Sequence, residues 1–244
     1  MTTDYATAWQ SYWEDLPAHA GEAIWDSHDT ALTTTLLRER LPLGLPMVDL
    51  GCGNGTQTRQ LAGHCARVIG VDLSRAALDH ARRLNSEPNI TYQCLDLCDP
   101  DATDRLRRSY GDCDVHMRYL LHQLPAEHRP ALLRSITTLL GLRGRLLAIE
   151  LDEDAHAAIS ALARQPGGPL PKLARALDHG IRPAQLTRAQ LERLLSDAGL
   201  RIRVRGRSVL RTTQRLPDDS RLTLPAVYLV ADARAEREHT DALA

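Results

Sequence analysis

The stretch Val48-Asp49-Leu50-Gly51-Cys52-Gly53-Asn54-Gly55 decides the fold of this chain. In it a short apolar run closes on an acid, and three glycines follow at alternate positions before a helical pattern begins at Thr56. Glycine permits positive φ and the close approach of a ligand to the backbone, and the N-terminus of a helix presents unpaired N–H groups. One glycine would be enough for a tight turn. We therefore predict a ligand-binding loop between a strand and a helix, with the carboxylate of Asp49 exposed at its start.

A dinucleotide site is the obvious alternative, because its fingerprint GxGxxG also follows a strand and opens a helix. Counted from Gly51, the third glycine of that fingerprint would stand at Thr56, and counted from Gly53 it would stand at Thr58. Neither count fits. An acid two residues before the first glycine would repel a phosphate and attract an ammonium or a sulfonium. The loop therefore favours a cationic ligand.

Short apolar runs alternate with amphipathic segments along most of the chain, which predicts an α/β fold. The runs at 46–50, 67–72, 89–95, 113–118 and 145–151 are typical of buried strands, and the segments between them have helical spacing. Such alternation predicts a parallel sheet covered by helices on both faces. A capping-box pattern then begins a helix at Thr187, and two further strands at 200–211 and 222–231 follow with no helix between them. We expect a seven-stranded mixed sheet that ends in an antiparallel hairpin.

Several segments resemble a known family. Residues 49–55 resemble motif I of the class I S-adenosylmethionine-dependent methyltransferases. Gly-Val-Asp-Leu-Ser at 70–74 and Cys-Leu-Asp-Leu at 94–97 resemble the ends of the family's second and third strands. Residues 114–122 and 142–150 resemble its fourth and fifth strands in the small-molecule, natural-product members, with Arg143 in place of the usual proline. The resemblance covers residues 45–151 and 187–232, and it implies a Rossmann-like fold and S-adenosyl-L-methionine as cofactor.

The resemblance also implies which residues hold that cofactor. In the family, the acid that ends the second strand, here Asp72, binds both ribose hydroxyls, and the acid after the third strand, here Asp96, faces the adenine amino group. Each acid could instead cap a helix or form a turn, but each follows its own predicted strand, where ligands of parallel sheets bind. The predicted cofactor-binding residues are Asp49, Gly51, Gly53, Asn54, Gly55, Asp72, Leu73, Asp96, Leu97 and Arg118.

If an oxygen or nitrogen must lose a proton during methyl transfer, a general base should lie just beyond the fourth strand. Such a base accelerates the reaction by about 10²–10⁴-fold. His122 is the best-placed candidate, with Tyr119 beside it, although a histidine there serves equally well as a hydrogen-bond partner of the backbone. Gln123 stands where many relatives carry a second histidine, which argues against a mechanism with two histidines. His116, on the strand itself, is expected to be buried packing.

Two segments outside the strand–helix alternation are expected to cover the acceptor. Residues 1–42 look helical and hold all three tryptophans, and residues 152–186 contain His179, a second candidate base. Cation–π attraction between an aromatic face and a nearby sulfonium contributes about 0.5–2 kcal/mol. The tryptophans would equally well form the packing core of a helical cap. The predicted substrate-binding residues are Tyr12, Trp13, Trp25, Tyr119 and His122. The predicted division is a cap at 1–42, a cofactor-binding core at 43–151 and 187–232, a cap insertion at 152–186 and a tail at 233–244.

Composition restricts the partners. The formal net charge of −1 gives no electrostatic reason to expect a nucleic acid. The five cysteines are scattered without a CxxC pair, so we expect no metal site. The first residues lack a basic and an apolar region, and no apolar run approaches the roughly 20 residues that span a bilayer, so we expect a cytoplasmic protein with no membrane partner. The sequence leaves open whether the chain works alone or as a homodimer.

The sequence therefore predicts an enzyme that transfers a methyl group to an oxygen or nitrogen of a small molecule, with a specialised metabolite as the expected substrate. Two alternatives stay open. The bound cofactor could instead serve a cyclisation or another rearrangement without methyl transfer, or the chain could be a non-catalytic partner subunit that binds the cofactor. A methyltransferase of nucleic acid or protein is disfavoured, because the charge is balanced and the fourth strand has no Asn-Pro-Pro-Tyr type of motif.

Overall fold

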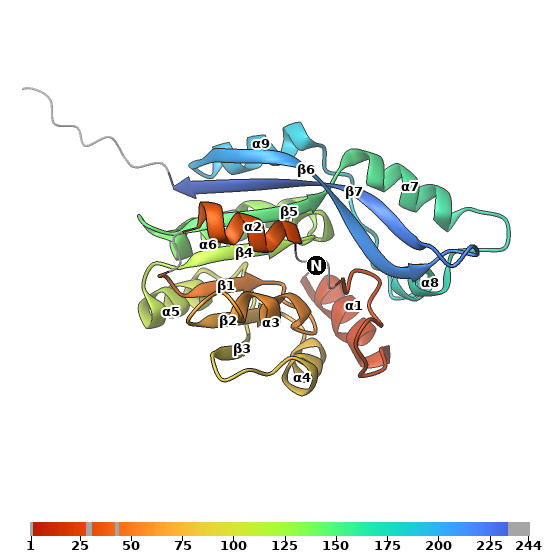
Figure 1. The fold of residues 1–244 in the computed structure, drawn as a ribbon, viewed down its shortest axis with the longest axis horizontal. Helices are drawn as coiled ribbons and strands as arrows, with labels where there is room; N and C mark the ends of the chain where they lie inside the picture. Colours follow the sequence, from red (N-terminus) through yellow and green to blue (C-terminus); the bar gives the residue numbers. More distant parts are fainter. Residues whose placement is uncertain (1, 28–30, 42–43, 234–244) are drawn as a thin grey trace, which may run out of the picture.

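The computed structural model describes residues 2–27, 31–41 and 44–233, and their side chains from Tyr5 onward. A seven-stranded sheet in the order β3-β2-β1-β4-β5-β7-β6 forms its centre (Figure 1). β1 to β5 run parallel, and β7 is antiparallel to both of its neighbours. The strands are β1 (Met47–Leu50), β2 (Val68–Asp72), β3 (Ile90–Cys94), β4 (Asp114–Arg118), β5 (Arg145–Leu151), β6 (Leu200–Arg215) and β7 (Arg221–Ala233). The predicted mixed sheet with a terminal hairpin is confirmed.

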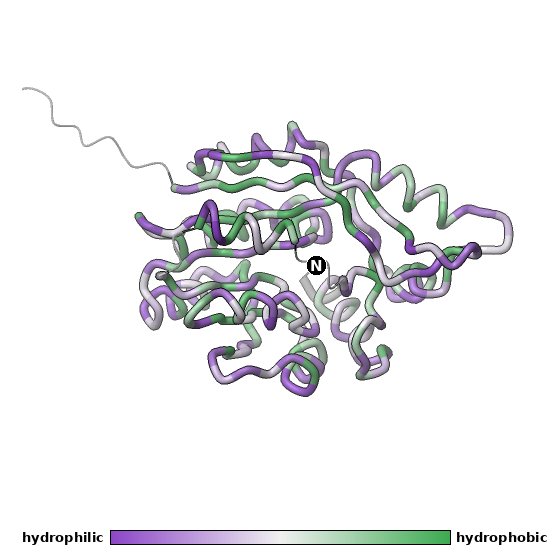
Figure 2. Tube along the Cα trace, in the orientation of Figure 1, coloured by the Kyte–Doolittle hydropathy of each residue, from purple (hydrophilic) through white to green (hydrophobic). Residues whose placement is uncertain are grey.

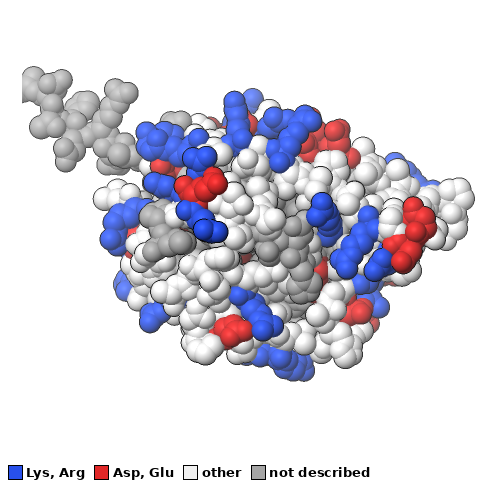
Figure 3. Space-filling model, viewed as in Figure 1, with Lys and Arg blue, Asp and Glu red and all other residues white. Residues whose placement is uncertain are grey.

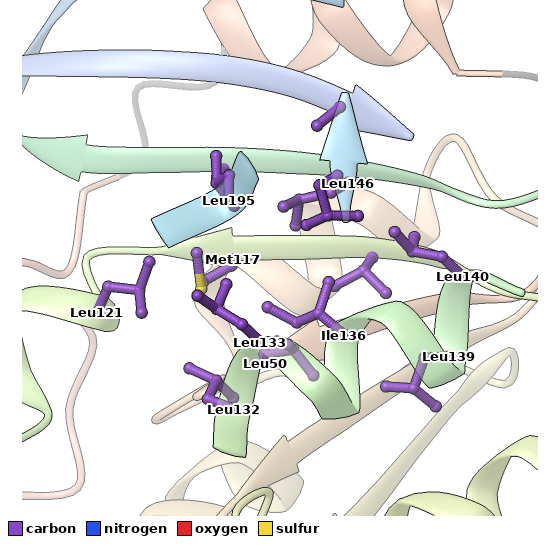
Figure 4. Close-up of a cluster of buried hydrophobic side chains, with 14 of the residues drawn as sticks. Leu50, Met117, Leu121, Leu132, Leu133, Ile136, Leu139, Leu140, Leu146 and Leu195 are labelled. Atoms are coloured by element: carbon purple, nitrogen blue, oxygen red, sulfur yellow. The ribbon is translucent and has the colours of Figure 1, made fainter. Parts of the chain in front are cut away.

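Helices cover both faces of this sheet. One face packs on α5 (Pro100–Tyr110), α6 (Arg129–Leu140) and α9 (Arg188–Asp197), and Figure 4 shows the leucines of α6 against Leu50, Met117 and Leu146 of the strands. The other face packs on α2 (Ala31–Arg40), α3 (Thr56–Ala62) and α7 (Glu153–Ala163). Figure 2 shows hydrophobic positions concentrated along the central strands and hydrophilic ones on the surrounding helices and loops. Burial of these apolar residues is the main stabilising contribution to the fold.

Local signals explain where two of the helices begin. α4 (Arg75–Leu84) begins after Ser74, whose hydroxyl accepts a hydrogen bond from Ala77 N at 3.1 Å. α9 begins after Thr187, which forms the complete predicted capping box with Gln190. Within the described residues, none of the helices has the length and apolar character needed to cross a membrane.

The amino-terminal region divides in a way that the sequence did not indicate. α1 (Thr2–Asp15) packs against α4, and its Tyr12 and Trp13 share a buried cluster with Ala176 of α8 (Pro171–Asp178). α2 instead buries Leu36 and Leu37 against the sheet. Only the first part of the predicted cap at 1–42 therefore lies over the carboxyl ends of the strands.

The hairpin also exceeds its prediction, because β6 and β7 extend to Arg215 and Arg221. Their far ends reach the side of the molecule where α1 and α8 lie (Figure 1), and α8 packs against β6. Within the insertion at 152–186, α7 covers the sheet and α8 joins α1. Of the predicted tail at 233–244, Ala233 still belongs to β7 and the rest lies outside the described residues.

Candidate functional site

The glycine loop after β1 has the expected backbone conformation. Gly51, Gly53 and Gly55 have φ of 64°, 54° and 78°, values that L side chains rarely adopt. A Cβ on Gly53 would lie 2.9 Å from Trp13 Cζ2, and a Cβ on Gly55 would collide with the Tyr92 hydroxyl. The loop therefore needs glycine both for its conformation and for close packing.

Asp49 does not have the predicted exposure. Its side chain is buried, with Oδ2 accepting a hydrogen bond from Thr58 Oγ1 at 2.6 Å and Oδ1 lying 2.7 Å from His116 Nδ1. A carboxylate can only accept, so the His116 proton lies on Nδ1. The expectation of an exposed carboxylate is wrong, because Asp49 holds the loop to α3 and β4 from beneath. His116 is buried as predicted, and it has this additional role.

Asp72 ties the loop to the end of β2. Its Oδ2 accepts a hydrogen bond from Gly53 N and its Oδ1 accepts one from Ser74 N, both at 2.9 Å. Burial raises the pKa of this carboxyl above its usual value, although the hydrogen bonds oppose the shift. Asp96 is exposed, and its Oδ1 accepts a hydrogen bond from Cys98 N at 2.8 Å. Both acids are thus turn residues, as the alternative interpretation expected, and both also line the main cavity.

A small pocket of about 50 Å³ lies beside the glycine loop. Asn54, one of the predicted cofactor residues, donates from Nδ2 to Asp26 Oδ2 at 2.9 Å. Among the described residues, the other oxygen of that carboxylate, Asp26 Oδ1, is buried and has no hydrogen-bond partner, and the same holds for Gln57 Oε1. Both residues line this pocket together with Gly51 and Arg118. An unpartnered buried carboxylate oxygen is costly, and a cationic ligand group would satisfy it.

Arg118 lies at the end of β4, between the small pocket and the main cavity. Its guanidinium carbon lies 4.6 Å from the centre of the Tyr119 ring, and no ion pair joins it to any described residue. Tyr119 itself has a φ of 56°, which is strained for a residue with a side chain. The end of β4 therefore presents a cation that is free to pair with an anionic ligand group.

The cavity that we call the main cavity, because it contacts both the glycine loop and His122, has a volume of about 170 Å³ and follows the edge where the parallel strands end. The predicted site residues that line it are Gly51, Gly53, Asp72, Leu73, Asp96, Leu97, Arg118, Trp13, Trp25, Tyr119 and His122. Asp49 and Asn54 border only the small pocket, and Gly55, Tyr12 and His179 border neither space. Tyr5 and Trp9 also line the cavity, although the sequence did not single them out for the site.

The aromatic residues of the cap form one cluster. Trp25 has its ring centre 5.3 Å from that of Trp9 and 5.2 Å from that of Tyr12. Tyr12 is 1% exposed and packs inside the cap, so the prediction that it contacts substrate is not supported. Trp9, Trp13 and Trp25 both pack the cap and line the cavity. The two interpretations of the tryptophans are therefore compatible.

His122 forms a buried pair that the sequence did not predict. Its Nδ1 lies 2.6 Å from Glu150 Oε2 at the end of β5, and Glu150 Oε1 accepts hydrogen bonds from Leu120 N and Leu121 N. Glu150 thereby holds the ring proton on Nδ1 and leaves Nε2 as an acceptor, with the Gln123 amide 3.0 Å away. This orientation suits a general base. Glu150 ends the segment that resembles the fifth strand of the family, but nothing local in the sequence indicates its partner.

His179 lies elsewhere. Its Nδ1 is 3.0 Å from Ser11 Oγ and its Nε2 is 3.4 Å from Asp15 Oδ2, so it joins α8 to α1. Arg175 supports the same junction through Asp15 and Glu22. The prediction of His179 as a base is therefore not supported. In the described part of the chain, no cluster of three His, Cys, Asp or Glu is arranged to hold a metal ion.

Comparisons with known proteins agree with this geometry. A methyltransferase domain model matches residues 47–144. A SAM-dependent methyltransferase from Anabaena variabilis, known from a crystal structure, is 32% identical in sequence to this chain. The alignment covers 94% of this chain and 95% of that protein's chain, and the two structures superpose with a TM-score of 0.86. A ubiquinone biosynthesis O-methyltransferase from Coxiella burnetii is 29% identical over 148 residues, which are 59% of this chain and 60% of that relative's length. N-demethylindolmycin N-methyltransferase from Streptomyces griseus is 34% identical over 101 residues, 38% of this chain and 40% of that relative.

Proposed function

Because the chain belongs to the S-adenosylmethionine-dependent methyltransferases, we propose that it transfers a methyl group to an oxygen or nitrogen of a small molecule. The observation that carries the proposal is a single cavity that joins the glycine loop and Asp72 to the pair formed by His122 and Glu150. When bound, the cofactor supplies a methyl group on sulfur, and the carbon–sulfur bond breaks with its electron pair remaining on sulfur while the acceptor atom takes the methyl.

The residues present fit this cofactor at both of its ends. Asp26 Oδ1 and Gln57 Oε1, buried with no hydrogen-bond partner in the described part of the chain, suit the ammonium group of the methionine moiety. Arg118, which forms no ion pair with a described residue, suits its carboxylate. Asp72 offers two carboxylate oxygens to a ribose diol. Asp96 lies farther along the same cavity, where the resemblance places the adenine amino group.

The chain's own contribution to the reaction is to hold the acceptor and take its proton. His122 Nε2 accepts that proton, and Glu150, buried and hydrogen-bonded to two backbone N–H groups, stabilises the resulting imidazolium. The aromatic cap covers part of the cavity, and displacement of water from it by the bound substrate would strengthen these interactions. Positioning alone supplies up to roughly 7–11 kcal/mol of such a barrier.

A cavity partly covered by the aromatic cap supports a small-molecule acceptor, and similarity to an N-methyltransferase for demethylindolmycin supports a specialised metabolite. On the face that Figure 3 shows, basic side chains predominate and a few acidic groups lie among them. The formal net charge of −1 supports the expectation of no nucleic-acid partner. A cytoplasmic location remains an expectation from the sequence, which leaves open whether the chain forms a homodimer.

Gly53→Arg tests the proposal, because the added side chain would fill the loop at the position that Trp13 now covers. We expect calorimetry with S-adenosylhomocysteine to show binding to the natural chain, none to Gly53→Arg and weakened binding to Asp72→Ala. Gly199→Arg is the matched control, because Gly199 also has a positive φ of 78° but nothing lies within 4 Å of its Cβ position. Unchanged affinity in both site variants would refute the assignment of the site, and a methyl-labelled cofactor that labels no acceptor would refute the transfer.

A further inference from the structure

The two halves of the main cavity differ in charge. The half under β3, β2, β1 and β4 is lined by Asp72, Asp96 and Arg118. The half under β5, β7 and β6 is lined by apolar side chains from the strands, α7, α8 and the loop that follows α8. We call this second half the apolar arm; it is formed mainly by Leu151, Ile159, Leu173, Ile181, Leu222 and Leu224. His122 lies between the two halves.

The apolar arm offers no partner to a charged group. Thr212 lines it, but its hydroxyl donates to Leu222 O at 2.9 Å and accepts from Gln214 N at 3.2 Å, so it is already satisfied. The cations of α8 face other groups, since Lys172 Nζ binds Gly21 O and Arg175 pairs with acids of the amino-terminal region. Among the described residues that line the arm, none is charged. A carboxylate or an ammonium that entered it would be buried without a counter-charge, which is strongly unfavourable.

We propose that the acceptor is an uncharged, largely apolar molecule of the phenol type, whose ring system occupies the apolar arm and whose hydroxyl reaches His122. The inference rests on the proposed methyl transfer. A charged substituent on the ring system would be buried in the arm, whereas an uncharged phenol enters neutral and still has a proton to give at His122. In the reaction the phenol oxygen gains the methyl carbon and its proton passes to His122 Nε2, while the electron pair of the broken carbon–sulfur bond stays on sulfur. The hydroxyl takes the place that the Gln123 amide occupies at Nε2.

Two naphthols that differ by one carboxylate test this assignment on the natural full-length chain. Calorimetry with 2-naphthol and with 6-hydroxy-2-naphthoate, in the presence of saturating S-adenosylhomocysteine at neutral pH, compares a neutral and an anionic molecule of the same ring shape. We expect the naphthoate to bind at least about 50-fold more weakly, because its carboxylate has no partner in the arm. Binding of the naphthoate within threefold of 2-naphthol, or more tightly, would overturn the inference.

A charge placed in the arm should reverse this preference. Leu222 is 8% exposed, and Leu222→Arg should raise the affinity for 6-hydroxy-2-naphthoate at least about tenfold and lower that for 2-naphthol. Leu142→Arg is the matched control, because Leu142 is 89% exposed and lies outside the cavity, and it should change neither affinity. Unchanged S-adenosylhomocysteine affinity shows that each variant is folded.

The outcome of methyl transfer is read separately from the outcome of binding. Selective binding of 2-naphthol together with a methylated product supports the inference and the proposed function. Selective binding with no labelled product for any neutral acceptor supports the apolar arm and refutes methyl transfer. Preferred methylation of the naphthoate supports methyl transfer and overturns the inference.

Discussion

Replacing Glu150 by glutamine should disable the base without unfolding the site. In the structure, Oε1 of Glu150 accepts two backbone hydrogen bonds, at 3.0 and 2.9 Å, and Oε2 lies 2.6 Å from His122 Nδ1. The oxygen of a glutamine can keep both backbone hydrogen bonds, so its NH₂ group must face Nδ1. The alternative rotamer would place donors against two N–H donors and is strongly disfavoured.

With an NH₂ group at Nδ1, that nitrogen becomes the acceptor and the ring proton moves to Nε2. His122 can then no longer take a proton from the acceptor. We expect Glu150→Gln to lower kcat by about 10²–10⁴-fold, which corresponds to about 3–5 kcal/mol of transition-state stabilisation. The affinity for S-adenosylhomocysteine should stay within about twofold of the natural value, since Glu150 does not line the cofactor half of the cavity.

The assay is methyl-labelled turnover with saturating cofactor, with cofactor binding measured by calorimetry on the same preparations. His122→Asn should lower kcat to a similar degree. Glu153→Gln, an exposed residue in the first turn of α7, is the matched control and should leave kcat unchanged. A kcat for Glu150→Gln within threefold of the natural enzyme would refute the reasoning, and so would an equal loss of cofactor affinity and activity.

Three further perturbations test other parts of the site. Asp26→Asn should weaken S-adenosylhomocysteine binding about 10–100-fold in calorimetry, because it removes the charge that faces the small pocket, and an unchanged affinity would contradict that role. Burial raises the pKa of Asp72, so this carboxyl should be protonated at a pH above the ordinary aspartate value of about 4, and binding of the ribose diol should weaken there. A pH titration of S-adenosylhomocysteine affinity should show this loss in the natural chain and a flatter profile in Asp72→Asn. Identical profiles would count against the role of Asp72. His179→Asn should keep kcat within about threefold while lowering the melting temperature slightly, because His179 only joins α8 to α1, and a loss of kcat comparable to that of His122→Asn would restore it as a base.

Features set by local sequence were predicted well. Ser74 and Thr187 begin their helices, and the acids Asp72 and Asp96 follow their strands, because capping and strand periodicity depend on neighbouring residues. The bounds of the parallel strands were right to within one or two residues, and β5 matched in full. The underestimated hairpin shows the limit of this approach, since the residues missed at the end of β6, Thr212 to Arg215, are all polar and give no apolar strand pattern, and β6 packs against α8.

Features set by long-range contact could not be predicted. The partner of His122 lies 28 residues away on β5, and that of Asp49 lies 67 residues away on β4. Asp26 faces the glycine loop only because α1 and the turn after it fold over the ends of the strands. No periodicity or spacing along the chain carries that information, so Glu150, Asp26 and the buried contacts of Asp49 emerged only from the structure.

A crystal structure of the full chain with S-adenosylhomocysteine tests the central claim most directly. We predict that the ribose hydroxyls lie within hydrogen-bond distance of the Asp72 carboxylate, with the amino group of the ligand at Asp26 and its sulfur facing the side of the cavity where His122 lies. Density for the ligand away from the loop at Gly51–Gly55, or a loop that stays closed by Trp13 in the presence of saturating ligand, would contradict the account.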